Sequence, residues 1–118
     1  MKYYTEIVPF ELAKKLKWAG FPQVLAPHTH FYTKLGRLSY FGDYDSPSET
    51  SIEAPTYAEV FDWLIEKGLS VELSAHLVVW KSTLWSIQPR QELFRGEGSF
   101  QEAADTAIET SCALLTEG

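Results

Sequence analysis

The chain has 118 residues, of which 45% are hydrophobic and 14% are aromatic. This length and composition exclude a disordered segment and predict a single globular domain over residues 1–118. The net charge of −6 opposes a general affinity for nucleic-acid backbones and for anionic membranes.

Residues 9–19 predict the first helix. Leu12 and Leu16 share its apolar face, and Gly20 follows where a left-handed residue commonly ends a helix. Three lysines are mostly directed elsewhere, and they have two interpretations: a solvated helix face or a nucleic-acid contact. These residues are Lys14, Lys15 and Lys17.

Residues 30–41 predict a β-hairpin that turns at Gly36. The next segment, residues 43–53, is rich in Asp, Ser and Pro and predicts a loop. The chain therefore places one hairpin and one loop between its first and second helices.

Residues 56–67 carry the clearest local signal in the chain. Thr56 and Glu59 have the spacing of a capping box, in which each side chain accepts a hydrogen bond from the other residue's amide. An apolar stripe at helical spacing follows, and Gly68 stands at the left-handed stop position. This segment predicts an amphipathic helix with both ends defined.

Apolar and polar residues alternate from Leu69 to Val79 and predict a strand with one buried face. Residues 81–83 predict a turn, and residues 84–88 predict an antiparallel return strand. Residues 91–94 predict one more short extended segment.

Residues 96–98, Gly-Glu-Gly, predict a loop before the last helix. Ser99 and Glu102 repeat the capping-box spacing, and small residues dominate the face of the helix that follows. The order of helix, hairpin, helix, hairpin and helix indicates an α+β fold. We expect a mainly antiparallel sheet of about four strands with helices packed mostly on one face.

Two features bear on location. The first residues lack the apolar run of a signal peptide, and no stretch approaches the roughly 20 apolar residues that cross a bilayer. The single cysteine, Cys112, cannot form an internal disulfide and fits a reducing compartment. We therefore expect a cytoplasmic protein with no membrane partner.

His28 and His30 form the one cluster that resembles a set of metal ligands. In an extended segment their side chains project to the same side and can bind one ion, with a further ligand from His76, Asp43 or Asp45. The alternative interpretation is two polar residues on the wet side of an edge strand.

The aromatic residues suggest a second kind of site. Trp80 and Leu84 have the opposite parity from the buried residues of the main strand, so we expect them on the other sheet face. Together with Trp85 they are candidates for a protein or oligomer interface. Burial on both faces of the sheet is the alternative.

The segment from Gly96 to Leu115 resembles the last helix of double-stranded-RNA-binding domains, which also follows antiparallel strands. Those domains carry lysines in the first turn of that helix, whereas this chain has Gln101, Glu102 and Asp105. We therefore do not expect nucleic acid as a partner.

Across most of its length the chain resembles a group of small proteins from Bacteroidetes genomes, often encoded near phage-like regions. The shared segments are Leu12–Lys17 with Gly20-Phe21, Ala54–Tyr57 with Phe61–Leu64 and Glu66-Lys67, and the helix from Glu102-Ala103 to Leu114-Leu115. The resemblance implies no known activity.

Three functions follow from these residues. The first is a non-catalytic module that binds another protein or itself, because no phosphate-binding loop, paired-cysteine motif or serine nucleophile motif is present. The second is a small metal-dependent enzyme that uses His28 and His30. The third is a nucleic-acid accessory protein that uses the three lysines. We favour the first, without a cofactor.

Overall fold

The computed structural model describes residues 2–42 and 45–117. Its elements are η1 (Lys2–Thr5), α1 (Phe10–Trp18), β1 (His30–Tyr32), β2 (Leu38–Tyr40), β3 (Ile52–Glu53), α2 (Tyr57–Glu66), β4 (Leu69–His76), β5 (Val79–Ser86), β6 (Gln91–Gly98) and α3 (Phe100–Glu117). The α+β class is confirmed. The single sheet of about four strands is wrong, because the described strands form two separate antiparallel sheets of three strands each.

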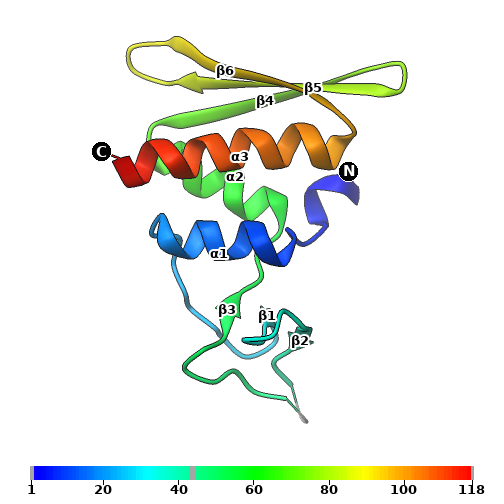
Figure 1. The fold of residues 1–118 in the computed structure, drawn as a ribbon, viewed down its shortest axis with the longest axis vertical. Helices are drawn as coiled ribbons and strands as arrows, with labels where there is room; N and C mark the ends of the chain where they lie inside the picture. Colours follow the sequence, from blue (N-terminus) through cyan, green and yellow to red (C-terminus); the bar gives the residue numbers. More distant parts are fainter. Residues whose placement is uncertain (1, 43–44, 118) are drawn as a thin grey trace.

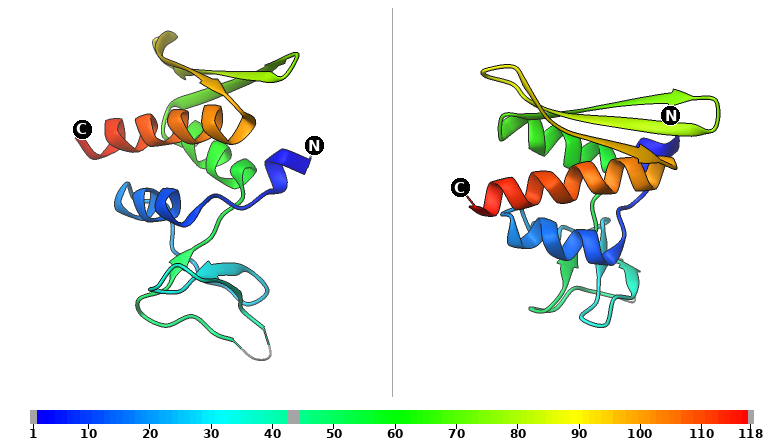
Figure 2. Two further views of the ribbon diagram at one scale, coloured as in Figure 1. Left: turned by 45° about the vertical axis from the view of Figure 1, so that its right-hand side comes forward. Right: turned by 45° about the horizontal axis from the view of Figure 1, so that its top comes forward.

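The three helices lie between the two sheets (Figure 1). Helices α3 and α2 pack beneath the larger sheet, and α1 packs against α3 on the side of the smaller sheet (Figure 2). Leu16, Leu64 and Ile108, one from each helix, are completely buried in the shared core. The hydroxyl of Tyr57 in α2 also donates to the carboxylate of Asp105 in α3 at 2.7 Å.

The predicted helix ends are confirmed by hydrogen bonds. The amide of Glu59 donates to the hydroxyl of Thr56 at 3.3 Å, and the amide of Thr56 donates to the carboxylate of Glu59 at 3.0 Å. Ser99 and Glu102 form the same reciprocal pair at the start of α3, at 3.1 Å in each direction. After α2, Gly68 takes the left-handed φ of +85° that the sequence required.

The smaller sheet has the strand order β2-β1-β3. Its hairpin turns at Gly36, as predicted, with a φ of +90°. Strand β3 falls where the sequence predicted a loop, and this prediction is wrong at Ile52 and Glu53, which pair with β1. The Glu53 side chain accepts a hydrogen bond from the amide of Leu25 at 2.7 Å. Leu25 is distant in the sequence, so local sequence patterns do not show that these two segments meet.

The larger sheet has the strand order β4-β5-β6. Its first turn is not at residues 81–83, because β4 and β5 pair without interruption from Leu69 opposite Ser86 to His76 opposite Val79. The turn is therefore formed by Leu77 and Val78. Neither residue is typical of a tight turn, where Asn and Gly are favoured, so composition does not reveal it.

Residues 96–98 were also predicted to form a loop, but they end strand β6. Gly96 lies opposite Ser82 and against α3. A Cβ atom there would lie 2.7 Å from the hydroxyl oxygen of Ser82 and 2.8 Å from that of Thr106. Glycine at this position marks a close approach of the helix to the sheet rather than a turn.

Candidate interaction surface

The two histidines of the predicted metal site lie beside one tyrosine of the smaller sheet. The Nδ1 atom of His28 is 3.3 Å from the hydroxyl of Tyr40, and the ring of His30 is 5.2 Å from the Tyr40 ring, centre to centre. His28 has a left-handed φ of +68° and is not extended, so the turn before β1 brings the two rings to Tyr40. Both side chains are exposed.

The further ligands that the sequence offered do not complete this site within the described residues. Asp45 faces Arg37, and His76 belongs to β4 in the other sheet. Asp43 lies outside the described residues. Residues 2–42 and 45–117 contain no group of three His, Cys, Asp or Glu side chains placed to hold one ion. The metal site and the enzyme based on it stay predictions without support from geometry.

The predicted aromatic interface is corrected in part. Trp80 and Leu84 lie opposite Ala75 and Val71 in β4, so they share the face that packs on the helices, and the expectation that they project from the other face is wrong. Leu84 is 0% exposed and cannot meet a partner. Trp80 is half-buried against the ring of Phe100, at 5.1 Å between centres.

Trp85 is the member of this group that belongs to the other face of the sheet. It follows the buried Leu84 and lies opposite Ser70. The guanidinium of Arg90 lies 4.5 Å from the centre of its ring, and Arg90 also pairs with Glu72 at 3.1 Å. Trp85 is therefore half-covered by its own chain, and its part in an interface stays a prediction.

A different tryptophan is the most exposed aromatic side chain among the described residues. Trp18, in the last turn of α1, is 85% exposed. The sequence held a signal for this, because Trp18 follows Lys14 by one helical turn and so falls on the lysine face, away from Leu12 and Leu16. We call the surface formed by Trp18 with Lys14, Lys15 and Lys17 of α1 and Glu109 of α3 the Trp18 surface.

Trp18 stands between two surface hollows. One, of about 320 Å³, runs between α1 and α3, and its lining residues are Lys15, Trp18, Glu109, Cys112, Ala113 and Thr116. The other, of about 390 Å³, is lined by Lys14, Lys17, Trp18 and Ile52. Tryptophan is among the residues that dominate interface energies, so this ring is a candidate anchor for a partner.

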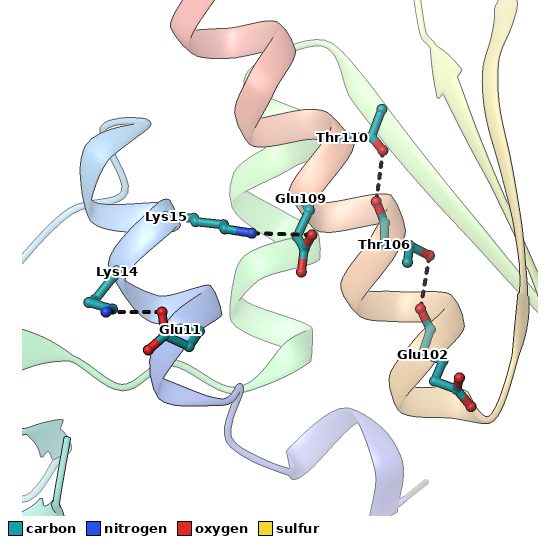
Figure 3. Close-up of polar contacts among 7 residues, drawn as sticks. All are labelled: Glu11, Lys14, Lys15, Glu102, Thr106, Glu109 and Thr110. Atoms are coloured by element: carbon teal, nitrogen blue, oxygen red, sulfur yellow. Dashed lines mark hydrogen bonds and ion pairs between the residues drawn. The ribbon is translucent and has the colours of Figure 1, made fainter.

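The charges around Trp18 are partly paired within the chain. Lys14 lies 2.9 Å from Glu11, and Lys15 of α1 lies 3.2 Å from Glu109 of α3 (Figure 3). Lys17 is exposed and makes no ion pair within the described residues. All four charged partners are substantially exposed, so these pairs exchange readily for contacts with another molecule.

The one thiol beside this surface belongs to the buried Cys112. Burial raises the pKa of Cys112 to about 11, so the thiol is protonated at neutral pH. Burial is also the main cause that raises the pKa of the other shifted groups, which are Tyr32, Glu53, Tyr57 and Asp105. Cys112 and Glu53 line two different hollows.

No protein-family model, no curated protein and no solved structure matches this chain. The resemblance to small Bacteroidetes proteins therefore stays a prediction. Within residues 2–42 and 45–117, none of the helices combines the length and hydropathy that a bilayer span requires.

Proposed function

We propose that this chain is a non-catalytic protein-interaction module that binds an acidic segment of another protein on the Trp18 surface. The observation that carries this proposal is the 85% exposure of Trp18 between two hollows. A cytoplasmic location and the relationship to the Bacteroidetes group belong to the same proposal.

The energetics favour a protein-binding role for this ring. Burying most of a tryptophan removes about 150–250 Å² from water, which is worth roughly 4–6 kcal/mol before the costs of association. An exposed tryptophan contributes none of this to the folded chain alone. Tryptophan is also among the residues that dominate measured interface energies.

The charges identify the partner's chemistry. Lys14, Lys15 and Lys17 surround the ring, and the first two are held by carboxylates of this chain. A partner segment with carboxylates beside an apolar residue would take over those contacts and pair with Lys17. Nucleic acid also attracts lysines and stacks on aromatic rings, but the net charge of −6 and the carboxylates of Glu11 and Glu109 oppose its backbone.

The experiment is a selection of peptides from a random displayed library against the wild-type chain, with counter-selection against Trp18→Ala. We expect peptides that contain Asp or Glu beside an apolar residue and that bind at least about tenfold more weakly to Trp18→Ala. Lys17→Glu should weaken the same peptides. Leu35→Ala, at a similarly exposed apolar residue beside the smaller sheet, is the matched control and should not.

Two results would overturn the proposal. One is a selection that yields no peptide dependent on Trp18. The other is tight binding of a labelled single-stranded oligonucleotide that is lost in Trp18→Ala and falls steeply with salt, which would indicate nucleic acid instead. Trp18→Ala should melt like the wild-type chain, since the ring is exposed.

A further inference from the structure

The larger sheet has two edges, β4 and β6, and within the described residues each pairs only with β5. The unpaired amide and carbonyl groups of an edge strand can bind another strand. Natural edge strands that stay single usually carry proline, bulges or charged side chains. The two edges of this sheet differ in these features.

Strand β6 carries the protective features. Its register with β5 shifts between Leu84 and Trp85. Charged residues also crowd it, at Glu92, Arg95 and Glu97. Strand β4 contains no proline or lysine, and its register with β5 is unbroken over all its residues. Strand β4 is therefore the edge that is open to pairing.

The turn after β4 places apolar groups beside this open edge. Leu77 and Val78 are almost completely exposed, and Ala75 on the face that carries Leu73 is exposed as well. Leu77 also has a left-handed φ of +58°, which a branched side chain resists. Figure 1 shows this turn at the end of the larger sheet, beyond the start of α3. A strained turn that exposes two apolar side chains indicates a contact outside the single chain.

We propose that β4 pairs with β4 of a second copy of this chain, antiparallel and about a twofold axis at Ser74. This pairing joins two three-stranded sheets into one sheet of six strands, with the helices of both copies on the same face. Antiparallel pairing about one residue places like faces of the two strands together.

The side chains of β4 select this register. An axis at Ser74 sets Glu72 opposite His76 of the partner subunit, and the same contact recurs across the axis. An axis at Glu72 or at His76 would instead place like groups opposite each other, which is unfavourable. On the helix side, the register sets Leu73 opposite Ala75 of the partner subunit. It also sets the half-buried Val71 opposite Leu77 of the partner subunit.

The proposal is independent of the Trp18 surface, which lies on α1 and α3. Glu72 already pairs with Arg90 at 3.1 Å, and both side chains are exposed, so the carboxylate remains available to a hydrogen-bond donor of a second molecule. The pairing would cover the turn residues that nothing in the described chain covers.

The first experiment measures sedimentation of the untagged chain and of charge variants. We expect a dimer at micromolar concentration and at least about tenfold weaker dimers for Glu72→Lys and for His76→Glu. The double variant, which carries both substitutions, should recover the dimer because it exchanges the two groups that face each other across the axis. The control exchange Arg95→Glu with Glu97→Lys on β6 should leave the dimer unchanged, and so should Trp18→Ala.

The second experiment locates the axis. In a Cys112→Ala background, Ser74→Cys places its two copies directly opposite, at a Cα separation of about 4.5–5.5 Å that a disulfide can span. We expect a disulfide-linked dimer under mild oxidation. Ser70→Cys, on the same face of β4, should not form one. A wild-type chain that stays monomeric, or a dimer that neither the charge variants nor Ser74→Cys affects, would overturn the proposal.

Discussion

Replacing Gly96 with alanine tests how closely α3 approaches the larger sheet. The added Cβ would lie 2.7 Å from the Ser82 hydroxyl oxygen and 2.8 Å from the Thr106 hydroxyl oxygen, whereas ordinary contacts of this kind begin at 3.4 Å. The Thr106 hydroxyl cannot turn away at no cost, because it donates to the carbonyl oxygen of Glu102 at 2.8 Å (Figure 3). One of these side chains, or α3 itself, must therefore shift.

The size of the effect follows from two opposing contributions. Overpacking of a filled core costs about 1–3 kcal/mol. Alanine also restricts the unfolded chain, which offsets about 0.4–1 kcal/mol. We expect a net loss of about 1–2 kcal/mol in the free energy of unfolding. With an unfolding entropy of about 2 cal/mol/K per residue, a chain of 118 residues should then melt about 4–8 °C lower.

The assay is thermal and urea unfolding followed by circular dichroism. Glu97→Ala is the matched control, because Glu97 is the next residue of β6 and is exposed, and it should change stability by less than about 0.5 kcal/mol. Ser82→Ala supplies a second test. The Ser82 hydroxyl is buried without a hydrogen-bond partner among the described residues, so its removal should relieve part of the clash.

A double-mutant cycle combines these variants. Gly96→Ala should cost at least about 0.5 kcal/mol less in the Ser82→Ala background than in the wild-type chain. A Gly96→Ala protein that melts at or above the wild-type temperature would show that the neighbouring side chains accommodate the added methyl group, and the overpacking argument at Gly96 would be wrong.

Two further predictions concern local features. Thr56→Ala removes the acceptor of the Glu59 amide and should lower the free energy of unfolding by about 1 kcal/mol, measured by urea denaturation; an unchanged midpoint would mean that the cap contributes nothing. Burial raises the pKa of Cys112 to about 11, whereas the thiol of an unfolded chain has a pKa of about 8.5. The contribution of Cys112 to the free energy of unfolding is therefore fully present below the unfolded pKa and is lost as the pH rises through the folded pKa. Native protein at about pH 8 should therefore resist iodoacetamide that labels the urea-unfolded chain, with rapid native labelling as the contradicting result.

The helix ends could be predicted from the sequence because their chemistry is local. Thr56 and Glu59 are three residues apart, and Gly68 acts within its own turn. The glycines of β6 could not be interpreted in the same way. Gly96 is small because Thr106 approaches it from another element, and a single sequence does not show which residues come together. A glycine in a loop and a glycine in a crowded strand cannot be told apart from the sequence alone.

One unrecognised turn also explains the error at the candidate interface. A two-residue turn at Leu77 and Val78 pairs odd-numbered residues of β4 with even-numbered residues of β5, as Val71 with Leu84 shows. If the turn is placed at residues 81–83 instead, Trp80 becomes part of the first strand and falls on the face opposite to the buried residues of that strand. The wrong face for Trp80 and Leu84 is therefore a consequence of register, since a shift of one residue exchanges the two faces of a strand.

The two proposed contacts lie where the sequence departs from local rules. Trp18 is apolar on a lysine face and gains nothing from burial in the isolated chain, and Leu77 has a positive φ in a fully exposed turn. Other positions depart from these rules as well, since Leu25 and His28 have positive φ and Leu35 is 94% exposed. The two contacts are proposed because Trp18 adjoins two hollows and Leu77 adjoins an edge of the larger sheet, and a second molecule is the simplest partner for each. Because Trp18 and Leu77 lie in different parts of the fold, the peptide selection and the charge exchange at β4 test this argument independently.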